Sequence, residues 1–198
     1  MSEMPSTSLA GWGITLEPLV LAHAEALLAA SSDGELWKLH YTSAPGPGIE
    51  EAERYIAKAL AGQHSGLMQP YAVIVDGRVV GSTRLYDIDY EVPTCAIGYT
   101  WYGASLQRTH VNTACKRLLL GHAFDERGMR TVYFHTSHEN LRSQAAIERL
   151  GAKKDGVIRQ HKRQKDGSLR DTVAYSILDS EWPAIRDALD ARLADIPR

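Results

Sequence analysis

The stretch YAVIVDGRVVGSTRLYDIDY, residues 71–90, constrains the fold of this chain more than any other segment. Two runs rich in β-branched and aromatic residues flank Asp76-Gly77. An Asp-Gly pair supplies the positive φ angles of a type I′ turn, so it joins two antiparallel strands directly. A third run of this kind spans residues 94–102, and Gly98 within it indicates a bulge or a close backbone approach. The sequence therefore predicts three consecutive strands of one sheet.

The rest of the chain predicts helices by its apolar periodicity, with further strands between them. The segment from residue 94 to residue 137 predicts a β-α-β unit, whose two strands should be parallel. The other predicted strands span residues 14–19, 131–137, 157–164 and 169–178. The predicted helices span residues 20–30, 49–60, 112–127, 140–151 and 180–193. This order favours a mixed α+β architecture over a regular alternation of strand and helix.

Length and composition favour one domain over residues 1–198, in the cytoplasm, with residues 1–11 flexible. The net charge of −2 makes nucleic acid an unexpected partner. The chain starts without the basic and apolar regions of a signal peptide, and no apolar run approaches the ~20 residues that span a membrane. Cys95 and Cys115 match no metal or redox spacing, so no metal is expected.

QRTHVN, residues 107–112, precedes one of the predicted helices. Backbone N–H groups at a helix start are free to bind an anion, and the helix dipole adds positive potential there. Phosphate-binding turns usually contain glycine, yet His110 and Asn112 stand in its place here. Their N–H groups stay available, Asn tolerates unusual backbone angles, and Arg108 could pair with a phosphate. Taken alone, an ordinary solvated helix start is the alternative interpretation.

Three segments, in the same order and spacing, resemble the Gcn5-related N-acetyltransferase (GNAT) superfamily. AIGYTWYGASLQRTHVNTACKRLLLGHAFDERG is similar to its fourth strand, acetyl-CoA loop and following helix. TSHENLRSQAAIERLGA is similar to its fifth strand end and next helix, and GVIRQHKRQKDGSLRDTVAYSILDSEW to its closing hairpin and tail. The branch it resembles is that of the ribosomal-protein N-terminal (RimJ/RimL-like) acetyltransferases. The resemblance implies a mixed central sheet of about seven strands, with a bulged, splayed fourth strand, flanked by helices.

The resemblance also implies acetyl-CoA as cosubstrate and gives roles to individual residues. The family's loop reads Gln/Arg-x-x-Gly-x-Gly/Ala, in which Gln107 matches. Asn140 corresponds to a residue that hydrogen-bonds the pantetheine arm, with a plain helix N-cap as the alternative. The main chain of Trp101 is expected to contact the same arm. The residues expected to hold the CoA pyrophosphate are Gln107, Arg108, Thr109, His110, Val111, Asn112 and Thr113.

The catalytic groups match the family less completely than the acetyl-CoA loop does. Ser143 corresponds to a serine near the thioester sulfur, where it would hydrogen-bond the leaving thiolate; a surface or capping hydroxyl is the alternative. The usual tyrosine acid corresponds to Ile147, and the usual carboxylate base to Ala96. His135 and His138 are interpreted as strand-end residues rather than metal ligands. The remaining candidates for a base are Asp87, Asp89, Glu91, Tyr99 and Tyr175.

These features predict acetyl transfer to a primary amine by direct attack within a ternary complex, without a covalent enzyme intermediate. The resemblance implies a protein N-terminal α-amine as acceptor, while small amines stay open. A CoA-binding sensor or scaffold without catalysis is the alternative, because the usual acid and base are both replaced. A homodimer through the C-terminal strands also stays open.

Overall fold

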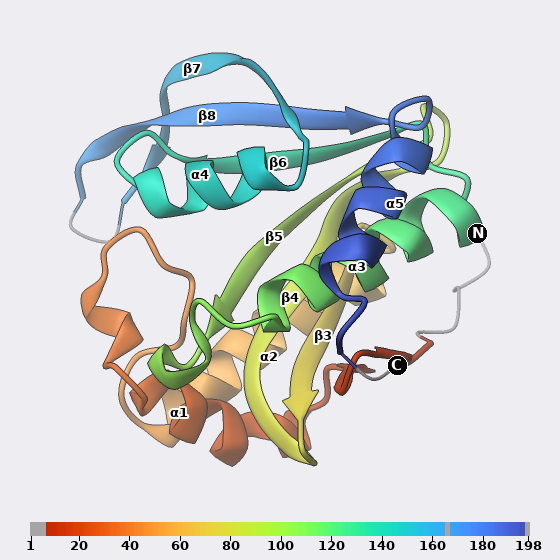
Figure 1. Cartoon of the computed structure of the whole chain (residues 1–198). Coiled ribbons are helices and arrows are strands. Elements are labelled where there is room, and N and C mark those ends of the chain that lie inside the picture. Colours follow the sequence, from red (N-terminus) through yellow and green to blue (C-terminus); the bar gives the residue numbers. More distant parts are fainter. Residues whose placement is uncertain (1–6, 165–166, 197–198) are drawn as a thin grey trace.

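The structure is a computed structural model that describes residues 7–164 and 167–196. Within these residues eight strands form one sheet, in the order β1-β2-β3-β4-β5-β6-β8-β7 (Figure 1). The strands are β1 Leu9–Gly11, β2 Ile14–Pro18, β3 Met68–Val75, β4 Arg78–Asp89, β5 Thr94–Tyr102, β6 Thr131–Ser137, β7 Lys153–Arg163 and β8 Leu169–Leu178. The predicted α+β architecture is confirmed. The expected count of about seven strands omits β1, which is too short to give a periodic pattern.

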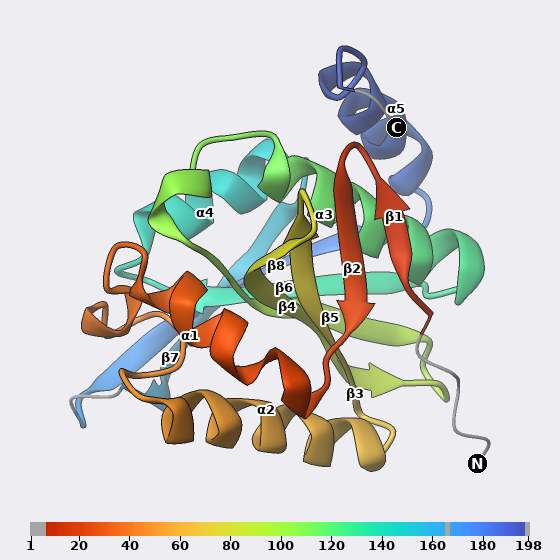
Figure 2. The same ribbon diagram turned by 90° about the horizontal axis from the view of Figure 1, so that it is seen from below.

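The helices lie on the two faces of this sheet (Figure 2). α1 Ala24–Ser32 and α2 Ile49–His64 cover one face, and α3 Val111–Gly121, α4 Leu141–Arg149 and α5 Trp182–Arg192 cover the other. Short 3-10 turns span Leu21–His23, Leu36–Lys38 and Ala104–Leu106, and a π turn His122–Glu126 continues α3. Over the described ranges, no helix is both long enough and apolar enough to cross a membrane.

The β3–β4 hairpin has the turn that its sequence predicts. Asp76 and Gly77 have φ angles of 49° and 72°, which are the left-handed values of a type I′ turn. β3, β4 and β5 pair antiparallel in succession, and β5 pairs in parallel with β6 after the α3 crossover. The predicted hairpin and the predicted β-α-β unit are therefore both confirmed, and they form the centre of the sheet.

The N-terminal segment differs from the expectation that residues 1–11 are flexible. Residues 1–6 lie outside the described part of the chain, but β1 pairs with β2 along its whole length. Leu9 and Trp12 are buried in the same apolar cluster as α3. The expectation is wrong for β1 because these two apolar side chains cover α3, and their burial holds the strand in place.

Two apolar clusters on opposite faces of the sheet define where each strand side chain points. The larger cluster joins α3 and α5 to strand residues that include Leu85 and Phe134. The smaller cluster joins α1 and α2 to strand residues that include Trp101. Because side chains alternate along a strand, Tyr86 on β4 and His135 on β6 belong to the face covered by α1 and α2.

Candidate functional site

β5 and β6 pair over three residues and then separate. The parallel register runs from Thr94↔Thr131 to Ala96↔Tyr133 and stops there. Beyond this point β5 stays paired with β4, and β6 with β8, while the two strands diverge (Figure 1). The facing edges of β5 and β6 then carry main-chain groups that no other described strand pairs with. We call this region the split; it is closed at Ala96 and opens toward the end of β5.

A β-bulge lies on β5 beside the split. Tyr99 and Thr100 of β5 stand opposite the single residue Thr83 of β4, and Tyr99 has a left-handed φ of 52°. The bulge therefore begins one residue beyond Gly98, where the sequence indicates it. Gly98 also makes the close approach, because a Cβ there would come within 2.7 Å of the Tyr86 ring. The bulge takes main-chain groups of β5 out of the β4 ladder, so they can face a ligand in the split.

The loop before α3 leaves several N–H groups free. The Thr109 hydroxyl donates to the Leu106 carbonyl at 2.7 Å and lies 3.3 Å from the Val111 N–H, which donates to it. Within the described residues, no acceptor is found for the backbone N–H groups of Thr109, His110, Asn112 and Thr113. Together with the positive end of the α3 dipole, these donors form a helix start that suits an anion.

This loop does not need the family's glycine. His110 occupies that position with an ordinary φ of −68°, while the left-handed residue is Arg108, with a φ of 66°. The Nε2 atom of His110 lies 3.2 Å from the Trp12 carbonyl oxygen, and Asn112 Oδ1 accepts from the Tyr102 hydroxyl at 3.4 Å. Both replacement side chains are thus bonded to protein groups, which keeps the backbone N–H groups accessible.

Arg142 is a site residue that the sequence analysis missed. Its Nη1 donates to Gln107 Oε1 at 2.6 Å, and Gln107 Nε2 donates to the Tyr102 carbonyl at 3.4 Å. These bonds join α4 to the α3 loop across the open end of the split. A cation in the first turn of a helix opposes the helix dipole, so the place of Arg142 in α4 is a sequence signal that suits a nearby anion. Arg108 and Arg142 are both exposed here.

Asn140 and Ser143 lie at the start of α4. Asn140 is its N-cap and accepts a hydrogen bond from the Ser143 N–H at 3.0 Å. The capping role that the sequence offered as the alternative is therefore present, and contact with a pantetheine arm stays a prediction. Ser143 is half-buried, and the cap fixes its backbone beside the split.

Trp101 packs its ring away from the α3 loop. The ring is buried in the cluster with α1 and α2, and its Nε1 donates to the Tyr55 hydroxyl at 3.2 Å. Its main chain pairs with Ser82 on the β4 side. The opposite edge of the strand faces the split, which is the edge expected to contact the pantetheine arm.

Two of the five candidate bases, Tyr175 and Asp89, are bonded to other groups of the protein. Tyr175 is fully buried in the α3-side cluster and donates to Glu148 at 2.9 Å; burial raises its pKa to about 12. Asp89 accepts from the N–H groups of Glu91 and Val92, which holds the β4–β5 turn together beyond the closed end of the split. Ile147, at the position of the usual acid, lies in the core.

Lys116 is the second residue that the sequence did not single out. Only 6% of it is exposed, and burial lowers its pKa from 10.5 to about 8. Its Nζ donates to the hydroxyl of Thr100 at 2.7 Å, and that hydroxyl lies 2.8 Å from the hydroxyl of Thr83. A buried ammonium therefore braces the β5 bulge from the α3 face. A lysine at helical spacing ordinarily indicates a solvated face, so only the packing reveals this contact.

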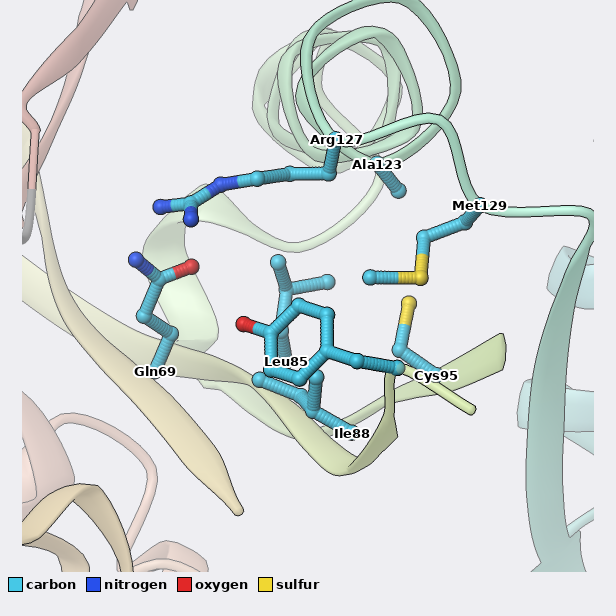
Figure 3. Close-up of a pocket in the computed structure, with 8 residues that line it drawn as sticks. Gln69, Leu85, Ile88, Cys95, Ala123, Arg127 and Met129 are labelled. Atoms are coloured by element: carbon cyan, nitrogen blue, oxygen red, sulfur yellow. The ribbon is translucent and has the colours of Figure 1, made fainter. Parts of the chain in front are cut away.

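The pocket in Figure 3 lies at the closed end of the split and is very small. Its volume is about 10 Å³, room for one water molecule. Its side chains come from the sheet and from the segment that follows α3: Gln69, Leu85, Ile88, Tyr90, Cys95, Ala123, Arg127 and Met129. It cannot hold a cosubstrate. Nor do three His, Cys, Asp or Glu side chains form a metal-binding cluster among residues 7–164 and 167–196.

Comparison with known proteins agrees with this geometry. The family model described as "Acetyltransferase (GNAT) domain" matches residues 14–153. The Bacillus subtilis (strain 168) protein named "Putative ribosomal N-acetyltransferase YdaF" is 30% identical over 110 residues, which are 56% of this chain and 59% of that protein. The match thus spans less than two thirds of this curated relative.

Solved structures share the fold over almost the whole chain. A GCN5-related N-acetyltransferase from Brucella melitensis is 33% identical with a TM-score of 0.87, and the match covers 98% of this chain and 88% of that one. Mycobacterium smegmatis RimJ, solved with CoA-disulfide, is 19% identical with a TM-score of 0.80 over 96% and 95% of the two chains. The second likeness concerns the fold alone. Since the family model matches residues 14–153, well over half of the sequence, the chain belongs to the acetyltransferase (GNAT) family.

Proposed function

We propose that this chain transfers the acetyl group of acetyl-CoA to a primary amine. The observation that carries the proposal is the group of free N–H donors at the start of α3, beside the open end of the split. Such donors suit a pyrophosphate, and the unpaired edges of β5 and β6 suit an extended, amide-containing arm. CoA has both parts, and membership of the GNAT family supports the same cosubstrate.

The proposed contacts follow the chain from the loop to the bulge. Within residues 107–113, the free backbone N–H groups of Thr109, His110, Asn112 and Thr113 bind the pyrophosphate, and Arg108 and Arg142 add positive charge. The pantetheine arm then runs along the outer edge of β5 at Trp101 and beside Asn140. The thioester lies at the bulge, where main-chain N–H groups of β5 polarise its carbonyl oxygen.

In the proposed reaction a neutral amine attacks the thioester carbonyl carbon directly, within a ternary complex. The C–N bond forms and the C–S bond breaks. The electron pair leaves on the CoA sulfur, which takes up a proton, and the amide and free CoA are released. Ser143, in the first turn of α4, hydrogen-bonds the departing thiolate. No group of the protein is acylated along this route.

A protein N-terminal α-amine is the acceptor that we favour. The curated relative is named for a ribosomal substrate. An α-amino group has a pKa near 8, so about a tenth of it is neutral at pH 7, whereas a lysine side chain is almost fully protonated. A weak base is therefore enough for an α-amine. Small amines are the other outcome of the acceptor test.

Calorimetry with acetyl-CoA, combined with thiol release in the presence of N-terminal peptides and small amines, tests the function. We expect binding together with amine-dependent thiol release. Binding without release across the whole panel would favour a CoA-binding sensor or scaffold, an alternative motivated by Ala96 and Ile147 at the usual base and acid positions. Absence of binding would contradict both functions.

Asn112→Pro tests the helix-start site directly. Asn112 is the second helical residue of α3, where the helix does not use its N–H, so proline removes a phosphate donor without breaking a helix bond. We expect acetyl-CoA to bind about tenfold more weakly, since a hydrogen bond to a charged group contributes roughly 1.5–3 kcal/mol. Asn112→Ala, which keeps the N–H, is the matched control and should bind nearly as tightly as wild type. Equal affinity of both variants would contradict this site.

Ser143→Ala tests the proposed role of the hydroxyl in thiolate departure. We expect kcat to fall several-fold with little change in acetyl-CoA affinity, because the group acts only as negative charge develops on sulfur. The Asn140 cap bonds to the Ser143 backbone, so the helix should keep its stability. Steady-state kinetics and calorimetry on the same preparation provide the comparison. An unchanged kcat would eliminate the role.

A further inference from the structure

A hydrogen bond between two side chains spans the split close to the point where β5 and β6 stop pairing. Gly98 on β5 and His135 on β6 each stand two residues beyond the last parallel pair, Ala96↔Tyr133. They therefore face each other where the strands begin to diverge. The Tyr86 ring lies over Gly98, and its hydroxyl is 3.2 Å from Nδ1 of His135. The Tyr86–His135 pair thus crosses the split on the face covered by α1 and α2.

The surroundings of His135 keep it neutral and partly accessible. Its side chain is half-buried, and its ring stacks on that of Tyr133 at 6.2 Å. Burial, and then the positive charge of Lys162, lower its pKa below the ordinary value of 6.5. Burial raises the pKa of Tyr86, so its phenol is neutral. The other titratable or charged groups facing the pair are Asp87 of β4, Tyr99 of β5, Asp155 and His161 of β7, and Arg170 of β8.

We propose that His135 takes the proton that the acceptor amine loses, with Tyr86 holding the imidazole in position. This inference rests on the proposed acetyl transfer. In the tautomer in which Nδ1–H donates to the Tyr86 oxygen, the lone pair of Nε2 is free. No described residue forms a hydrogen bond with that nitrogen. The neutral amine attacks the thioester carbon, and the proton that its nitrogen loses as the C–N bond forms moves to Nε2, directly or through one water.

The two faces of the sheet separate the two proton transfers. His135 faces α1 and α2, whereas Ser143 lies on α4, which covers the opposite face (Figure 2). The amine thus arrives on one side of the thioester, and the thiolate is stabilised from the other. Ala96 stands where the usual carboxylate would be, and it and Gly98 are the small residues of β5 beside Tyr86, while the Tyr99 ring of β5 packs edge-on against the Tyr86 ring at 5.1 Å.

The pH profile of the wild-type enzyme is the first test. If a neutral amine and a neutral His135 are both required, log(kcat/KM) for the amine rises with slope 1 below the pKa of the amine. It should steepen to slope 2 below the pKa of His135, which lies under 6.5. A slope that stays at 1 down to pH 5, in enzyme shown to be folded there, would overturn the proposal.

His135→Asn is the second test. Asparagine can still bond to Tyr86 in place of Nδ1, but it cannot accept the proton. We expect kcat/KM to fall about a hundredfold, the slope-2 limb to disappear, and acetyl-CoA affinity to stay within twofold. Tyr86→Phe should lower kcat/KM about tenfold and move the pH at which the slope changes. An active wild type with an unaffected His135→Asn variant would overturn this inference alone.

His138→Asn is the matched control, since His138 is an exposed histidine three residues away whose ring lies 3.4 Å from the Asp171 carbonyl. It should leave both kcat/KM and the pH profile unchanged. A loss equal to that of His135→Asn would mean that the effect is not specific to His135, which overturns the proposal. A wild-type protein that binds no acetyl-CoA overturns the proposed function, and the inference falls with it.

Discussion

Lys116→Met is expected to raise the free energy of unfolding by about 2 kcal/mol at pH 7 and to lower kcat about tenfold. The drop in the pKa of Lys116 from 10.5 to about 8 corresponds to about 3 kcal/mol of cost for the buried charge. The lost bond to Thr100 offsets about 1 kcal/mol of this. Activity should fall because the ammonium no longer fixes the bulge that we propose polarises the thioester. Denaturant unfolding and steady-state kinetics measure the two effects.

The pH dependence of stability separates the contribution of Lys116 from other effects of the substitution. Its pKa is lower in the folded state, so between pH 8 and pH 10.5 the unfolded chain binds more protons at this site. The contribution of Lys116 to stability therefore rises with pH across that window. The advantage of Lys116→Met should shrink between pH 7 and pH 10.5. Lys58, which is exposed on α2, provides the control in Lys58→Met, and neither stability nor kcat should change by much. A destabilised Lys116→Met protein at pH 7 would contradict this account.

Gly81→Ala is expected to destabilise the protein by about 3 kcal/mol. Gly81 lies on β4 opposite Tyr102, and an added Cβ would stand 2.1 Å from the carbonyl oxygen of Trp101. That atom belongs to backbone, so β4 and β5 must move apart next to the bulge. Acetyl-CoA affinity should fall together with stability, because β5 provides the edge that we propose contacts the pantetheine arm. Denaturant titrations of the variant and the wild type, fitted with the same m-value, give the difference in the free energy of unfolding.

Gly156→Ala is the matched control for Gly81→Ala. Gly156 also lies in a strand, β7, but an added Cβ there meets nothing within 4 Å. Alanine in a strand loses less backbone entropy than glycine, so stability should rise by about 0.5 kcal/mol. If both variants lost the same stability, the close approach of β4 to β5 would not be the cause.

The sequence predicted the centre of the fold well and its edges less well. The Asp76-Gly77 turn and the parallel β5–β6 pair follow from local chemistry and from the handedness of β-α-β connections. β1 was missed because its three residues are too few to show an alternating apolar pattern, and its stability comes from packing on α3. The position of the loop proposed to bind the pyrophosphate was predicted from the start of the helix. The reason that His110 can replace glycine came only from the φ angles of the folded loop.

By itself, the sequence determined the order of elements, the bulged strand and the helix start that suits an anion, because turn residues, periodicity and free N–H groups are local properties. Only the tertiary structure decided which side chains act together at the split. Tyr86 contacts His135, which is 49 positions away in the sequence, and Arg142 contacts Gln107, which is 35 positions away. Lys116 is buried next to Thr100. Sheet register and helix packing set these contacts, and both are fixed by long-range burial of apolar surface, which no local pattern encodes.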